Sequence, residues 1–189
     1  MNKTIAFDLG VKGAYAYHTN ENVIWTKAFD LDTKKHFLQR LKTLSNLFTN
    51  LQRKELKGGC DLIYPNTNNF KNFNWKTGMQ LTMYNGALCS RLNDGFIFEI
   101  FEYKAYKWLC DRFGELVFEH SNHLSDKFGE WDKIKHKKKR TQMALSSILR
   151  YDFKGWKVIG NWTTNYDEAD ALMMLLYHMS YYVKSKTQN

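Results

Sequence analysis

The sequence predicts an α/β fold in which a mixed five-stranded sheet is flanked by helices. Three short segments with alternating apolar residues come first, at residues 4–9, 12–18 and 23–29, and short turns separate them. An amphipathic helix over residues 33–51 then leads to a fourth apolar segment at residues 60–64. A helix between two strands implies a crossover. Strand four is therefore expected to lie parallel to strand one, beside an antiparallel meander of strands one to three.

The rest of the chain extends this pattern, and we interpret residues 1–189 as one domain. Further elements are expected as a helix over residues 77–92, a fifth strand over 96–101 parallel to the fourth, a short helix over 103–110, a helix that ends near 151, a short extended piece at 156–160 and a helix that begins at 165. Residues 111–131 combine mixed charge with Gly114 and Gly129, so we interpret them as an insertion of loops, with a short hairpin or helix within it as the alternative. Residues 185–189 are polar and are expected to form a flexible tail.

Composition narrows the class of protein. Hydrophobic residues make up 43% of the 189 residues, enough for a sizeable core. No run of about 18 apolar residues is present, so no membrane span is expected. The N-terminus leads directly into a strand pattern rather than a signal peptide, and a cytoplasmic location is expected. The cysteines, Cys60, Cys89 and Cys110, are odd in number and widely spaced, which favours reduced thiols over a disulfide framework or a zinc knuckle.

The chain is basic, with 28 Lys and Arg against 19 Asp and Glu and a net charge of +9. Such a balance favours a polyanionic partner, most often nucleic acid. Part of the charge is concentrated in a run at residues 133–140, which either neutralises DNA phosphates or forms a solvated basic face. The candidate DNA contacts in this run are Lys135, Lys137, Lys138, Lys139 and Arg140.

Three acids stand at positions that suit metal chemistry. Asp8 ends the first strand, and Asp167 and Asp170 lie in the first turn of the last helix, three apart and so on one face, while Glu168 points about 100° away. Acids in a first turn also serve simply as caps. Clustered carboxylates repel one another unless a cation neutralises them, and Mg²⁺ prefers such hard oxygen ligands. Two such ions can activate water and stabilise the leaving oxygen of a phosphodiester.

These motifs together resemble RuvC-type Holliday junction resolvases of the ribonuclease H-like superfamily. Asp8-Leu-Gly10 after a strand resembles the start of these enzymes, and Asp167-Glu-Ala-Asp-Ala-Leu172 is similar to their terminal helix motif. Lys137-Lys-Lys-Arg-Thr-Gln-Met-Ala144 resembles the basic start of their penultimate helix, which contacts DNA phosphates. The resemblance covers the chain apart from residues 111–131. It implies a ribonuclease H-like sheet, a homodimer, a bacteriophage version of the family acting inside an infected bacterium, and Mg²⁺ as cofactor with Mn²⁺ as a substitute.

The resemblance also implies site residues, with one departure. It makes Asp8, Asp167 and Asp170 metal ligands and catalytic residues. The family has a glutamate at the end of strand four, where this chain reads Tyr64-Pro-Asn-Thr-Asn-Asn69 and places Asn66 nearest. An amide oxygen ligates a cation without adding negative charge. Either Asn66 takes the glutamate's place in a diminished or substituted site, or Glu99 or Glu168 supplies the acid.

The loop after strand four carries the aromatic residues Phe70 and Phe73. The resemblance implies that one of them inserts as a wedge at the junction centre; the alternative is that it packs beneath the loop.

The leading functional expectation is a Mg²⁺-dependent endodeoxyribonuclease that resolves four-way or branched DNA. The alternative is a resolvase-like protein that binds junctions without efficient cleavage. A fragment of an actin-like kinase also begins with a strand ending in Asp-Leu-Gly, but that family needs further glycine-rich phosphate loops and about twice the length.

Overall fold

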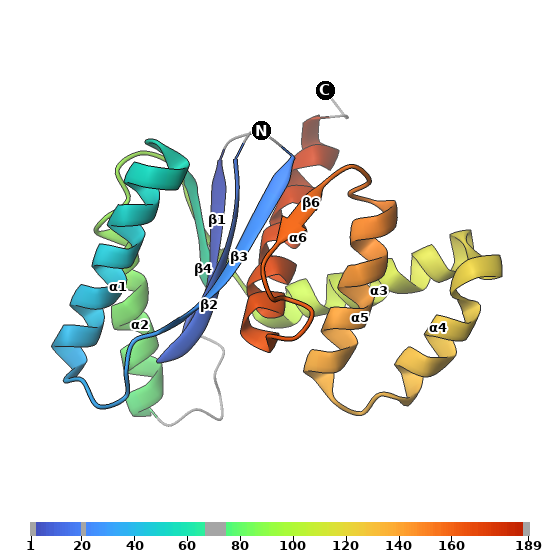
Figure 1. The fold of residues 1–189 in the computed structure, drawn as a ribbon, viewed down its shortest axis with the longest axis horizontal. Helices are drawn as coiled ribbons and strands as arrows, with labels where there is room; N and C mark the ends of the chain where they lie inside the picture. The colour runs from blue at the N-terminus through green and yellow to red at the C-terminus, as the bar shows by residue number, and fades with distance from the viewer. Residues whose placement is uncertain (1–2, 20–21, 67–74, 187–189) are drawn as a thin grey trace.

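The sheet of this protein is mixed and has helices on both of its faces (Figure 1). The computed structural model describes residues 3–19, 22–66 and 75–186, with side chains as far as residue 181. The strand order across the sheet is β5-β4-β1-β2-β3-β6. The α/β class and the mixed sheet are confirmed, and the sheet has six strands where the sequence predicted five.

The antiparallel meander forms as expected. It consists of β1 (Thr4–Asp8), β2 (Lys12–His18) and β3 (Val23–Asp30), and Asp8 lies opposite Ala14 in the β1–β2 register. The additional strand is β6 (Lys157–Ile159), which pairs in parallel with β3. With three residues, β6 is too short to show an alternating pattern, which is why the sequence indicated only an extended piece there.

The other half of the sheet is parallel, and this determines where the acids lie. β4 (Asp61–Pro65) pairs in parallel with β1, and β5 (Ile97–Ile100) pairs in parallel with β4. Parallel strands end at the same edge of a sheet. The residues that end or follow β1, β4 and β5 therefore share one edge.

One face of the sheet is covered by α1 (Phe37–Leu51), its π-helical extension η1 (Gln52–Leu56) and α2 (Trp75–Cys89). The odd-numbered side chains of β1 point to this face, where Phe7 packs edge-on against Phe48 of α1 with ring centroids 5.7 Å apart. Burial of these large apolar side chains holds the two helices on the sheet.

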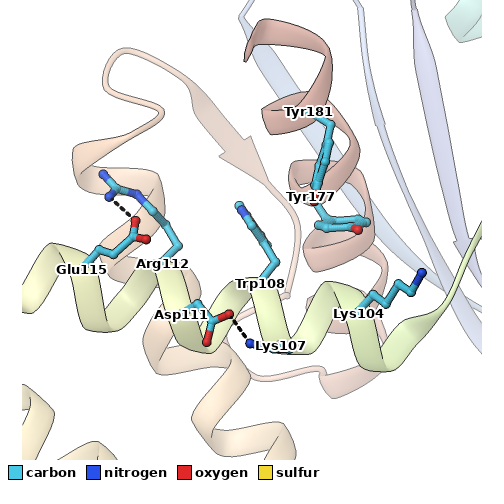
Figure 2. Close-up of a pocket in the computed structure, with 8 residues that line it drawn as sticks. All are labelled: Lys104, Lys107, Trp108, Asp111, Arg112, Glu115, Tyr177 and Tyr181. Atoms are coloured by element: carbon cyan, nitrogen blue, oxygen red, sulfur yellow. Dashed lines mark hydrogen bonds and ion pairs between the residues drawn. The ribbon is translucent and has the colours of Figure 1, made fainter. Parts of the chain in front are cut away.

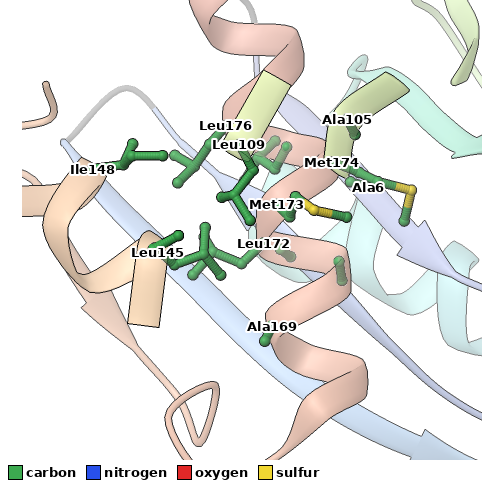
Figure 3. Close-up of a cluster of buried hydrophobic side chains, with 14 of the residues drawn as sticks. Ala6, Ala105, Leu109, Leu145, Ile148, Ala169, Leu172, Met173, Met174 and Leu176 are labelled. Carbon is green, nitrogen blue, oxygen red and sulfur yellow. The ribbon is translucent and has the colours of Figure 1, made fainter. Parts of the chain in front are cut away.

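The opposite face carries α3 (Glu102–Glu119), α5 (Lys137–Tyr151) and α6 (Tyr166–Lys186). Figure 3 shows α6 between its neighbours, with Leu172 and Leu176 beside Leu145 of α5 and Leu109 of α3. Residues 168–176 of α6 are all buried, so this helix is enclosed by the sheet and by two helices. In the described part of the chain no helix combines the length and apolar character needed to cross a membrane.

Residues 111–131 are helical almost throughout, so the expected loops do not form there and the helix named as an alternative does. α3 continues to Glu119, and α4 (Ser121–Lys133) packs against α3. Gly114 and Gly129 lie within these helices at positions where a Cβ atom would meet nothing within 4 Å. Each glycine lowers helix propensity by about 1 kcal/mol without ending the helix, because burial of side chains such as Leu116 and Leu124 outweighs that cost. α6 extends into the expected tail as far as Lys186, and residues 187–189 lie outside the described residues.

Candidate active site

Asp8, Asp167 and Asp170 lie near one another at the edge where the parallel strands end. Asp8 is the last residue of β1, and α6 packs against β1 and β2 with its first turn at that edge. The Oδ1 atom of Asn165 accepts hydrogen bonds from the backbone N–H groups of Asp167 and Glu168, at 3.0 and 3.1 Å. Asn165 therefore caps α6, and the alternative that the acids are only helix caps is not needed.

Mutual repulsion and burial act on these carboxyl groups. The pKa of Asp8 is raised to about 8, chiefly by burial and then by the negative charges of Asp170, Glu102 and Asp167, against a smaller opposite effect of Lys138. Burial likewise raises the pKa of Asp170 to about 6, with Glu102 as the strongest charged contributor. The acids are therefore within electrostatic reach of one another at a site that is partly shielded from water, with Asp170 buried and 32% of the Asp167 side chain exposed.

Glu102 is a fourth acid that the sequence analysis missed. It is the first residue of α3, two positions after β5, and it acts on the pKa of both Asp8 and Asp170. Its Oε1 atom lies 2.5 Å from the Nζ atom of Lys137. The signal was available in principle, because an acid directly after a strand parallel to β1 ends at the same edge as Asp8.

Two lysines of the predicted basic run face this acid cluster. Lys137 and Lys138 begin α5, and the Nζ atom of Lys138 lies 3.1 Å from Oδ1 of Asp167 and 4.0 Å from Oδ2 of Asp170. The same ammonium group is 5.9 Å from the ring centre of Tyr166. The basic start of α5 and the acidic start of α6 thus form one site.

The remaining basic candidates have other surroundings. Lys135 and Lys139 are exposed. The guanidinium of Arg140 lies 4.7 Å from the ring centre of Trp131 and donates a 2.6 Å hydrogen bond from Nη2 to the carbonyl oxygen of Asp132. Arg140 therefore links the end of α4 to α5.

Asn66 lies at the same edge but contacts a different acid. Its side-chain amide donates a 2.7 Å hydrogen bond to Oε2 of Glu99, whose Oε1 accepts a 2.8 Å hydrogen bond from the hydroxyl of Tyr64. Glu99 lies opposite Tyr64 in the β4–β5 register, and Tyr64 belongs to the core beneath α1 and α2. The structure thus places Asn66 beside Glu99, and it places Glu102 among the aspartates.

Glu168 has a structural role. Its carboxylate is buried and accepts hydrogen bonds from the hydroxyl of Thr26 at 2.6 Å and from the backbone N–H groups of Ala28 and Asn161 at 3.1 and 2.7 Å. These bonds tie α6 to β3 and to the segment after β6. Phe70 and Phe73, the candidate wedge residues, lie outside the described residues.

The carboxylate oxygens are of the kind that a hard divalent cation prefers, although the side chains are not arranged as a complete metal site. Among the described residues, no three His, Cys, Asp or Glu side chains converge closely enough to hold a metal ion. Oδ1 of Asp170 is buried and makes no hydrogen bond, which is costly for a carboxylate unless a cation or donor joins it. Oxygen donors from Asp8, Asp167 and Asp170 match the preference of Mg²⁺ and Mn²⁺.

A separate groove of about 490 Å³ lies between α3 and α6 (Figure 2). Trp108 and Tyr177 form its aromatic wall, with ring centroids 5.8 Å apart. Four of its charged residues form ion pairs, because Lys107 pairs with Asp111 at 2.6 Å and Arg112 pairs with Glu115 and also with Asp152. The ammonium group of Lys104 lies 4.9 Å from the ring centre of Phe101. We assign this groove no part in the chemistry of the acid cluster.

The fold of this chain is similar to that of a protein whose structure has been solved. The structure is similar to the crystal structure of the yeast mitochondrial Holliday junction resolvase Ydc2, with a TM-score of 0.54 and 16% sequence identity over 94% of this chain and 78% of that one. This chain has a ribonuclease H-like fold. No family model matches the sequence, and no curated protein matches it. At this level of identity the likeness concerns the fold, and the function rests on the site itself.

Proposed function

We propose that this protein is a metal-dependent endonuclease that cuts four-way or branched DNA. The observation that carries the proposal is the cluster of Asp8, Asp167 and Asp170 at one edge of a ribonuclease H-like sheet, with the basic start of α5 directly beside it. A carboxylate cluster and a phosphate-binding surface in one place are the two requirements of hydrolytic phosphodiester cleavage. The solved structure with the similar fold is itself named as a Holliday junction resolvase.

The acidic residues of the cluster would bind the metal ion, and the lysine beside them would bind phosphate. Asp8, Asp167 and Asp170 would hold Mg²⁺, or Mn²⁺ in its place, and Glu102 is a further candidate ligand. The ion, when bound, supplies activation of water and stabilisation of the leaving 3′-oxygen. Burial keeps the acids in a site of low dielectric, where their attraction for a cation is stronger than at an exposed surface. Lys137 is positioned to neutralise a phosphate beside the acids.

DNA binding would rest on the basic surface around α5. Lys135 and Lys139 are exposed and extend the charge of Lys137 and Lys138 along one side of the site. Each phosphate neutralised in this way releases counter-ions, so affinity should fall steeply as salt is raised. Stacking of a base on Phe70 or Phe73 would add to the affinity for the junction.

The second candidate function is junction binding without efficient cleavage. It is favoured by the amide at Asn66, which leaves the end of β4 without an acid. Glu102 favours the nuclease instead, because it adds a fourth carboxylate to the same edge. Two variants separate these views. If Glu102 completes the metal site, Glu102→Gln should abolish cleavage and Asn66→Glu should add little to it. If the amide of Asn66 leaves the metal site without a necessary carboxylate, Asn66→Glu should increase Mg²⁺-dependent cleavage.

Cleavage of a labelled four-way junction by site variants tests the proposal. Asp8→Asn and Asp170→Asn should each reduce the rate of cleavage by at least about a hundredfold while leaving junction affinity within a few-fold of the unchanged protein. Glu115→Gln is the matched control, because this exposed acid of α3 pairs with Arg112 away from the cluster. Full cleavage by Asp8→Asn would refute the site.

We further propose that the protein acts as a homodimer, because symmetric cutting of a four-way junction needs two sites related by a two-fold axis. α2 offers a surface for this contact. Its exposed positions Met79, Met83 and Gly86 follow one another at helical spacing, and residues 77–90 contain no charged side chain. Because this stripe carries no charge, a second copy of the basic chain meets no like charge there.

A further inference from the structure

The side chain of Lys138 occupies the position between the acids that a bound cation would need. Its Nζ atom is 3.1 Å from Oδ1 of Asp167 and 4.0 Å from Oδ2 of Asp170. Nearly all of the Asp170 side chain is buried, with 9% exposed, whereas 41% of the Lys138 side chain is exposed. The ammonium group is therefore a partly exposed positive charge held against a buried negative one.

A divalent cation and this ammonium group compete for the same oxygens. Oδ1 of Asp170 has no hydrogen-bond partner, but Oδ2 of Asp170 and Oδ1 of Asp167 face Lys138. Two cations a few ångströms apart repel strongly where water is scarce. Entry of the ion therefore requires the ammonium group to leave, and without a new partner that step gives up its ion pairs.

A DNA phosphate offers the new partner. Lys138 lies in the first turn of α5 between Lys137 and Lys139, on the surface to which we assign phosphate binding. A lysine side chain is long and flexible, so an exposed ammonium group turns from one partner to another without any change in the core.

We propose that Lys138 is an internal counter-ion that couples the binding of metal to the binding of DNA. In the free protein it neutralises Asp167 and Asp170; when DNA binds, it moves to a phosphate and leaves these oxygens to the metal ion. The inference rests on the proposed function, since it takes the acids as metal ligands and α5 as the DNA surface. Coupling of this kind is reciprocal: the metal increases affinity for the junction by the factor by which the junction increases affinity for the metal.

The coupling keeps the site inactive when no DNA is present. Metal binds weakly to the free protein, so a loaded nuclease assembles on its substrate rather than in solution. Coupling factors between sites commonly lie between about 5-fold and 150-fold.

The test uses Ca²⁺ as the probe ion and compares Lys138→Gln with Lys139→Gln in the full chain. Both variants lose one positive charge from the same turn of α5, but Lys139 is exposed and its side chain points elsewhere, toward a hollow lined by Gln142 and Met143. Calorimetry measures Ca²⁺ affinity without DNA. Fluorescence anisotropy measures junction affinity in Ca²⁺ and in EDTA.

Lys138→Gln should bind Ca²⁺ about tenfold more tightly than the unchanged protein in the absence of DNA, and Ca²⁺ should no longer improve its junction affinity. Lys139→Gln should lose junction affinity but keep both the Ca²⁺ affinity and the Ca²⁺ effect of the unchanged protein. If the two variants bind Ca²⁺ alike, the coupling through Lys138 is refuted. If Asp170→Asn leaves Ca²⁺ binding unchanged in the Lys138→Gln background, the ion does not bind at these acids, and the proposed metal site fails as well.

Discussion

Replacing Asp8 by asparagine should stabilise the folded protein at alkaline pH. The pKa of this carboxyl group rises from 3.8 to about 8 on folding, chiefly through burial and then through the charges of Asp170 and Glu102. Between these two pH values the folded protein binds more protons than the unfolded chain, so its stability falls as pH rises. The pKa difference sets a ceiling of about 6 kcal/mol, which we reduce to about 2–3 kcal/mol because Asp8 is only partly buried and carboxylates relax on ionising.

Urea unfolding of the unchanged protein and of Asp8→Asn in EDTA measures this effect. The two should be about equally stable near pH 4, and the variant should be more stable by about 2–3 kcal/mol at pH 8.5. Glu115→Gln is the control, since this exposed acid pairs with Arg112 away from the cluster and its removal should bring no gain. Equal stability at both pH values, or a less stable Asp8→Asn at pH 8.5, would refute the electrostatic account of the cluster.

Three further predictions concern the metal, the fold and the dimer. Mg²⁺ affinity measured by calorimetry should rise from pH 6 to pH 8, and proton release should accompany binding. The reason is that Asp8 and Asp170, with pKa values of about 8 and about 6, must lose their protons to bind the ion. Binding that does not depend on pH would contradict this. Glu168→Ala should lower the free energy of unfolding by about 2–4 kcal/mol, because it leaves one buried and two partly buried donors without their partner. A loss below about 0.5 kcal/mol in urea unfolding would contradict this. Met83→Glu should convert a dimer to a monomer in light scattering, whereas Phe118→Glu, at an 88% exposed position of α3, should not; a dimer that survives Met83→Glu would exclude this face of α2.

The sequence was most informative where its periodicity was regular. β2 was predicted at its observed bounds because alternating residues along the strand face two different cores. The first three strands, the crossover to β4 and the acidic start of α6 followed from the same patterns. The region after residue 110 was misjudged because Gly114 and Gly129 were treated as helix breakers, and only the packed structure shows that both point into open space.

The candidate site was predictable in part. Asp8, Asp167 and Asp170 were found because each stands at the end of a recognisable element. Glu102 was missed although β5 was expected beside β4, because the next helix was expected to begin only at residue 103 and because the approach of Glu102 to Asp8 and Asp170 depends on how α3 packs against α6. The pairing of Lys138 with Asp167 was also beyond the sequence, because it depends on how α5 and α6 pack.

The measurement that tests the central claim most directly is a gel assay of a four-way junction and a matched linear duplex, each with Mg²⁺ and with Ca²⁺. We predict selective binding of the junction in both ions and paired, symmetric nicking of the junction in Mg²⁺ only. Selective binding without nicking would contradict the nuclease and favour the binding function instead. Equal binding of both DNAs without nicking would contradict both functions.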